Sequence, residues 1–208
     1  MTHTLHRQGD RPGLSEDFVV FAISAQGINS KGSAAQFAEF SRLVQQHNPV
    51  NIGDMRTGNK FAVDLETIAA STQDNSIFHA VFTDPSDVAA VLSDLARADL
   101  GLSIVVSGLF DQIGKCCRDA GLDEHTVEYS LGVWGRTDRL PHPAVQEIAT
   151  MCGHGMVSFH LIDHCAKEIQ QRKMPSEEAA RVLARQCHCG IFNPVRAAQI
   201  LEAYAEQQ

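Results

Sequence analysis

The 208-residue sequence lacks the features that would place it in a specialised class of protein. It contains no apolar run long enough to span a bilayer, no internal repeat and no low-complexity tract. It also lacks an excess of positive charge, because its formal net charge is −8 at pH 7. We therefore expect neither nucleic acid nor a membrane as a partner. The hydrophobic fraction of 44% and the charged fraction of 20% are typical of a soluble globular protein.

Cysteine is absent from the first 115 residues, and all six cysteines lie beyond them. Residues 1–12 are polar without an apolar signal core, so we expect a disordered arm over residues 1–16 and a cytoplasmic protein. Structural disulfides are rare in that compartment. Three of the cysteines stand in Cys-x-His or Cys-x-Cys units, and the chain has 10 histidines, which favours metal over disulfides.

Between residues 17 and 139 the sequence alternates between strand and helix patterns. Apolar runs rich in β-branched and aromatic residues predict strands at 18–23, 77–82, 102–107 and 126–134. Apolar spacing and capping residues predict helices at 33–46, 61–70, 84–97 and 109–120. Runs this apolar fit a sheet covered by helices and at least partly parallel. We expect an α/β domain over residues 17–139, as a small open sheet or as an α+β, ferredoxin-like arrangement.

The second part of the chain begins after residues 140–143, Leu-Pro-His-Pro, where strand patterning ends. Everything beyond is helical, which predicts a small all-α metal-binding module over residues 144–208. Two turns in it carry soft ligands, Cys152-Gly-His-Gly155 and Cys187-His-Cys189-Gly190. Thiolates suit Zn²⁺ or iron–sulfur clusters. The adjoining glycines allow tight turns and leave N–H groups free to point at sulfur atoms.

These two turns resemble the helical [2Fe–2S] domain of molybdenum hydroxylases of the xanthine dehydrogenase type. That family has a Cys-Gly-x-Cys-x-x-Gly-Met segment before one helix and a Cys-x-Cys-x-Gly segment before another. Matching Gly155 and Met156 places Cys152 on the second cysteine of the first segment, while Cys187 and Cys189 match the later pair. The residues after the pair also roughly match the family, namely Phe192, Val195 and Ala198.

The resemblance covers about fifty residues, and it departs from the family where the first cluster cysteine would stand. That position is Ala149. The chain also lacks the plant-type cluster domain that precedes this module in the family. The resemblance therefore implies a related helical cluster site with ligands Cys152, Cys187 and Cys189, and a fourth position to be filled.

Several groups could fill the fourth position. His154 is nearest in sequence, and mixed Cys/His shells on iron are known. Cys165 stands on the next helix, while the first part of the chain offers Cys116, Cys117 or His125. The position could also be open to substrate, as in catalytic metal sites.

The α/β domain has its own candidates for binding an anionic ligand. Ser107-Gly108 joins a strand directly to a helix, where free N–H groups can hold an anion. A glycine-punctuated loop contributes Asn51, Asp54 and Arg56. His125 and Glu128 begin the last expected strand and are candidates for acid/base catalysis.

Three functions follow from these patterns. The first is an iron–sulfur protein, most simply with a [2Fe–2S] cluster, that transfers electrons to a partner protein or serves as a redox subunit. The second is a metalloenzyme, an oxidoreductase or a metal-dependent lyase, with an open coordination position for a small anionic molecule. The third is a non-catalytic binding protein stabilised by zinc. Each is compatible with a homo-oligomer.

Overall fold

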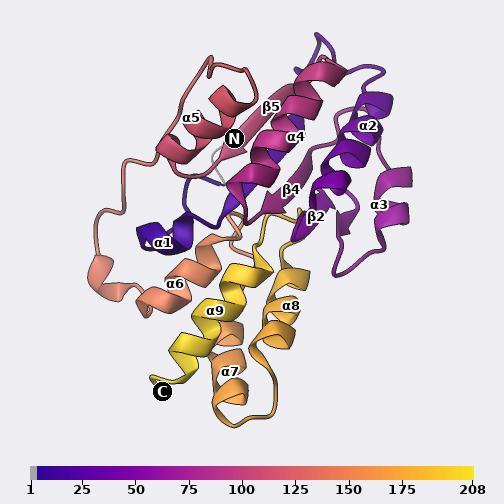
Figure 1. The fold of residues 1–208 in the computed structure, drawn as a ribbon. Coiled ribbons are helices and arrows are strands. Elements are labelled where there is room, and N and C mark those ends of the chain that lie inside the picture. The colour runs from indigo at the N-terminus through magenta and orange to yellow at the C-terminus, as the bar shows by residue number, and fades with distance from the viewer. Residues whose placement is uncertain (1–3) are drawn as a thin grey trace.

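The computed structural model of the protein describes residues 4–208, and its centre is one five-stranded sheet (Figure 1). The strands follow the order β3-β2-β4-β1-β5. Their bounds are β1 (Phe18–Ile23), β2 (Asn51–Asp54), β3 (Gly58–Asn59), β4 (Phe78–Phe82) and β5 (Ser103–Ser107). Every strand pair among the described residues is antiparallel, so the expectation of a partly parallel sheet was wrong. The protein is of the α+β class.

Helices connect and cover the strands. Those of the first part of the chain are α1 (Arg11–Leu14), α2 (Ala34–Val44), α3 (Leu65–Ala70), α4 (Pro85–Ala98) and α5 (Phe110–Asp119). Those of the second part are α6 (Pro143–Thr150), α7 (Phe159–Gln170), α8 (Ser176–Gln186) and α9 (Pro194–Ala205). Two short 3-10 turns are η1 (Gln45–His47) and η2 (Thr137–Arg139). No helix within residues 4–208 combines the length and apolar character needed to cross a membrane.

The connections between strands form two interlocked units. Helix α2 leads from β1 to β2, and β4 lies between these strands; helix α4 leads from β4 to β5, and β1 lies between those. Two such units give the strand order of a ferredoxin-like sheet, here with β3 added at one edge.

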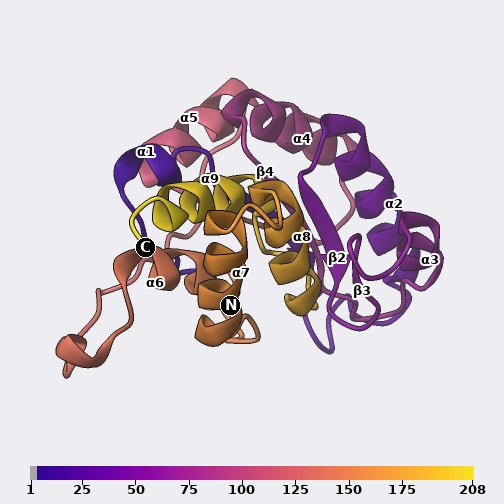
Figure 2. The same ribbon diagram turned by 90° about the horizontal axis from the view of Figure 1, so that it is seen from below.

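Both faces of the sheet are buried, and this explains why the sequence suggested parallel strands. Along β1, Phe18 and Val20 pack with α2, α4 and α5, while Val19 and Phe21 pack with the C-terminal helices. Figure 2 shows these two helical layers on opposite sides of the strands. A strand buried on both faces is a continuous apolar run whatever its direction, so the run indicated burial and not orientation.

Two expectations about the connecting segments need correction. Residues 126–134 form no strand, because no neighbouring strand supplies hydrogen bonds to them. The expected disordered arm is placed against the body over residues 4–16, where Thr4 is buried and α1 forms; residues 1–3 of that arm lie outside the described residues.

Candidate metal centre

The two cysteine turns meet against the sheet. Cys152 follows the end of α6, and Cys187 is the residue that ends α8. Gly155 and Gly190 adopt left-handed backbone conformations, with φ of 67° and 81°. Glycine adopts this conformation without steric cost, which lets each chain reverse within a few residues of its sulfur ligands.

The three expected thiol ligands contact one another. Cys152 hydrogen-bonds to Cys187, which in turn hydrogen-bonds to Cys189, and each of the three is at most 2% exposed. His154 joins them, because its Nδ1 lies 3.7 Å from the Cys189 sulfur. The thiols contact one another in series. Within residues 4–208, no group of three or more His, Cys, Asp or Glu side chains is arranged around a single point where a metal ion could bind. The structure thus brings together the four residues that the sequence singled out.

Hydrogen bonds determine how readily each thiol ionises. The pKa of Cys152 is raised, first by its hydrogen bond with Cys187 and then by burial. The hydrogen bond from Cys152 lowers the pKa of Cys187, but the hydrogen bond with Cys189 and burial outweigh it and raise this pKa to about 12. The hydrogen bond from Cys187 lowers the pKa of Cys189. Cys189 is therefore the thiol of this group that most readily becomes a thiolate.

Backbone N–H groups also act on each sulfur. Hydrogen bonds from Met156 and His154 favour the thiolate of Cys152. The N–H of Phe192 does the same for Cys187, and that of Ile191 for Cys189. Such donors stabilise thiolates in metal and cluster sites and help to set their reduction potentials.

Strands β2 and β3 hold the second cysteine turn in place. A Cβ at Gly190 would lie 2.6 Å from the backbone nitrogen of Gly53, so the turn and β2 are in direct backbone contact. The buried Asn59 side chain donates to the carbonyl oxygens of Ala184 and Cys187, at 3.1 and 2.8 Å. Asn51 donates to the carbonyl of Phe192 at 2.8 Å. These contacts fix the carbonyls of the turn, which leaves its N–H groups directed at sulfur.

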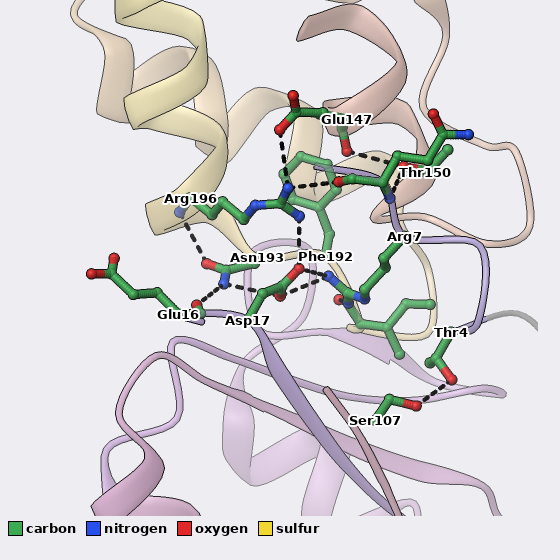
Figure 3. Close-up of polar contacts among 12 residues, drawn as sticks. Thr4, Arg7, Glu16, Asp17, Ser107, Glu147, Thr150, Phe192, Asn193 and Arg196 are labelled. Carbon is green, nitrogen blue, oxygen red and sulfur yellow. Dashed lines mark hydrogen bonds and ion pairs between the residues drawn. The ribbon is translucent and has the colours of Figure 1, made fainter. Parts of the chain in front are cut away.

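A buried ionic cluster holds the far end of the same turn (Figure 3). Asp17, which precedes β1, accepts hydrogen bonds from Arg7 at 2.6 Å and from Arg196 at 2.9 Å. Arg196 is 1% exposed and also contacts Glu147 of α6 at 3.1 Å. Arg7 donates to the carbonyl of Ile191.

The same cluster includes Asn193, the residue just before α9. Asn193 caps that helix by accepting from the N–H of Arg196, and its amide donates to Asp17 at 3.1 Å. The cluster therefore joins the N-terminal segment, β1, α6 and α9 around the turn that carries Cys187 and Cys189.

A cavity of about 370 Å³ lies beside Cys152. Ala149, the position of the missing cluster cysteine, lines it, as do His6 and Thr150. The small Ala149 side chain leaves space next to the Cys152 turn, which a small molecule could occupy.

The other candidate ligands lie elsewhere. Cys116 and Cys117 belong to the apolar core between the sheet and α4–α5, and Cys165 is buried on α7. His125 and Glu128 are exposed residues of the α5–α6 connection.

The expected anion-binding residues have local partners. Ser107 donates to Thr4 at 2.6 Å, and Gly108 is packed closely by the Phe18 ring. Asp54 accepts from the backbone of Arg56 at 3.1 Å, while the Arg56 side chain contacts Gln73. The Asn51 side chain donates to the carbonyl of Phe192 in the cysteine turn. The structure does not gather these residues into one site.

The sequence reasoning missed the residues that support the cysteine turn. Asn59, Asp17 and Arg196 are all buried polar side chains, but none of them stands in a cysteine or histidine motif. His79, fully buried on β4 beside the Phe21 ring at 5.4 Å, was also missed. A lone histidine within an apolar strand was its one sequence signal.

Comparisons of the chain with protein-family models, with curated proteins and with solved structures find no match.

Proposed function

We propose that the protein is an iron–sulfur protein whose cluster is held by Cys152, Cys187 and Cys189, with His154 as the fourth ligand. The observation that carries this proposal is the meeting of three buried thiols that hydrogen-bond to one another in series and each receive a backbone N–H donor. Among the described residues, the core cysteines Cys116, Cys117 and Cys165 form no such series of thiol hydrogen bonds. When bound, the cluster would accept and release an electron.

The contact between His154 and Cys189 supports the assignment of the fourth ligand. Ligands of one tetrahedral metal lie about 3.5 Å apart for a sulfur and a nitrogen, from metal–ligand bonds of about 2.3 and 2.0 Å. The observed separation is 3.7 Å. Binding would further require the cysteine side chains to rotate, because in the described residues the thiols do not yet surround one point.

The surrounding residues would control the electron transfer. Burial of all three sulfurs excludes water, and the N–H donors from residues 154, 156, 191 and 192 favour negative charge on them. Asn51, Asn59 and the ionic cluster hold the backbone that carries those donors. This rigidity keeps the hydrogen bonds constant between the two oxidation states, which reduces the reorganisation that electron transfer requires.

The cavity beside Cys152 favours a second candidate function, a metalloenzyme. If the fourth coordination position is open, a small molecule in the cavity at Ala149 could reach the metal, with His6 as the titratable group that lines it. The sequence led us to expect an anionic molecule. In this case His154 would serve in proton transfer and not as a ligand.

Metal analysis of anaerobically purified protein tests the proposal. We expect iron and acid-labile sulfide in equal amounts with a visible absorption spectrum. Colourless protein with one zinc per chain would overturn the iron–sulfur assignment and favour a zinc-stabilised binding protein.

The variants His154→Ala and Ala149→Cys then distinguish the two candidates. Loss of cluster in the first and an unchanged spectrum in the second support His154 as the ligand. An unchanged His154→Ala protein, together with a new spectrum in Ala149→Cys, supports the open position.

A further inference from the structure

The connection between α5 and α6 contains a segment with the pattern of a strand but without a partner. In residues 126–134 the alternate side chains are apolar and exposed: Val127 58%, Tyr129 65%, Leu131 77% and Val133 51%. Trp134 at the end is 81% exposed. Exposed apolar side chains at every second residue are typical of a strand that is completed by another chain. We call residues 126–134 the strand-like segment.

Among the described residues, the backbone of this segment has hydrogen-bond partners only within the segment itself, at Gly132 and Leu131. Within residues 4–208, no backbone hydrogen bond joins residues 123–134 to any other part of the chain. Figure 2 shows part of the α5–α6 connection reaching out beyond the rest of the molecule. The segment therefore offers both a row of backbone groups and an apolar side.

Strand β5 is the matching open edge. Among the described strands it pairs only with β1, and its Ile104, Val105 and Val106 are half-buried whereas the central strand β1 is almost fully buried. A groove of about 1060 Å³ runs along β5. Its walls include Ile113 and Phe110 of α5, and Leu122. An open edge with apolar side chains is the usual place for a strand to be added.

We propose that the strand-like segment of one copy of the protein pairs with β5 of a second copy, and that the exchange is reciprocal. Each copy supplies one segment and one edge, so a two-fold dimer uses both and leaves neither open. A different partner protein placed on β5 would leave the segment exposed. The seven residues from Val127 to Val133 are long enough to pair with all five residues of β5.

The path of the chain favours exchange over pairing within one copy. Residues 122–130 line the groove across from β5 without hydrogen-bonding to it, and Tyr129 instead contacts the Phe110 ring at 6.0 Å. The chain must then continue to α6, which lies beside the C-terminal helices and away from this edge (Figure 1). The proposal is independent of the metal centre.

Light scattering of the full-length purified protein, as loaded with metal during expression, tests this dimer. The chain has a mass of 22.7 kDa, and we expect twice that value at micromolar concentration. The double variant Leu131→Asp with Val133→Asp should be monomeric, because charge on the apolar side prevents burial. Ile28→Asp is the matched control: Ile28 is 86% exposed in another loop, and this variant should remain a dimer.

Hydrogen exchange of the unmodified protein gives a second readout. The amides of residues 126–134 and the outer amides of β5 should be protected in the dimer and should lose protection on dilution. A monomer whose segment exchanges freely would overturn the proposal. So would a monomer with a protected segment, which would mean pairing within one copy, and so would a dimer that the double variant leaves intact.

Discussion

The two faces of the central sheet are covered by helices in similar ways but differ in chemistry. The face beneath α2, α4 and α5 is a hydrocarbon core in which Cys116 and Cys117 are the polarisable groups. The opposite face contacts buried amides, a buried ionic cluster and three thiols. Both faces bury cysteine, so burial alone does not distinguish a ligand from a core residue.

The difference lies in what surrounds the sulfur atoms. The pKa values of Cys116 and Cys117 are raised, mainly by burial, and so is that of Cys165. No other thiol hydrogen-bonds to any of these three within the described residues, whereas Cys152, Cys187 and Cys189 hydrogen-bond to one another. Cys116, Cys117 and Cys165 are therefore suitable controls for substitutions at the three contacting thiols.

The largest expected effect is the loss of metal from a Cys187→Ser variant. Cys187 contacts both other thiols and is fully buried, so its removal takes away the central member of the group. We expect less than about a tenth of the wild-type metal content, because loss of one thiolate from a buried centre removes a primary ligand. The matched control is Cys165→Ala, which should retain the wild-type content. Equal metal in the two variants, measured by elemental analysis, would contradict the assignment of the site.

The next effect concerns the ionic cluster that holds the cysteine turn. Asp17→Ala leaves Arg7 and Arg196 buried without their shared carboxylate, and we expect a loss of about 3–5 kcal/mol in the free energy of unfolding. Asp111→Ala breaks an exposed pair with Arg11, for which about 0–1 kcal/mol is expected. Denaturant unfolding of the metal-free proteins measures both. Similar values for the two variants would show that the buried cluster does not stabilise this face.

The contrast between the faces also explains what the sequence could predict. The expected helices and the four expected strands rest on local patterns of apolar and capping residues, and three of those strands formed where expected. The short strands β2 and β3 were not expected. The fourth, residues 126–134, has the same pattern but no neighbouring strand to pair with. A local apolar pattern does not indicate whether such a neighbour is present. The direction of the strands could not be predicted from the apolar pattern either. Burial on both faces removes the apolar–polar alternation that is typical of antiparallel strands.

The residues of the candidate site also fall into a group that the sequence could predict and a group that it could not. Cys152, His154, Cys187 and Cys189 stand in two short motifs, so their chemistry can be read from the sequence. Asn51 and Asn59 act on the cysteine turn across more than 120 residues of chain, with separations of 141, 125 and 128 residues in their hydrogen bonds. Contacts of this kind depend on the tertiary fold, and a single sequence contains no local sign of them.

A pair of glycines tests whether the turn is held by β2. Both Gly190 and Gly155 have positive φ, so an alanine at either position costs about 1–2 kcal/mol of backbone strain. At Gly155 the added Cβ meets nothing within 4 Å, whereas at Gly190 it would meet the Gly53 backbone at 2.6 Å. We expect Gly190→Ala to be less stable than Gly155→Ala by a further 1–3 kcal/mol, roughly the cost of overpacking. Equal stabilities in thermal unfolding would mean that the turn moves freely away from β2.

The next contrast concerns the pH dependence of metal affinity. At pH 7 the thiols of Cys152 and Cys187 hold their protons, since both pKa values are raised above the ordinary 9.0, and metal must displace them. Each displaced proton makes the apparent affinity rise about tenfold per pH unit, so Cys152 and Cys187 together contribute about a hundredfold, or roughly 2.7 kcal/mol. Competition with a coloured chelator between pH 6.5 and 8.5 measures this slope. Cys165→Ala, whose thiol lies outside the centre, should leave the slope unchanged, and an affinity independent of pH in the unmodified protein would contradict displacement of thiol protons.

The same pKa values determine whether the stability of the metal-free protein rises or falls with pH. Above about pH 9 the thiols of the unfolded chain ionise while the folded ones keep their protons, so the unfolded state binds fewer protons and the folded state loses stability as the pH rises. Below pH 9 this contribution is fully present and constant. Cys187→Ser should reduce the loss of stability at alkaline pH, because it removes a thiol whose pKa reaches about 12. An equal loss of stability in this variant would show that other groups are responsible for it. On the opposite face, Cys117→Ala removes a thiol whose pKa is raised mainly by burial, and comparison of the two slopes separates burial from the thiol contacts.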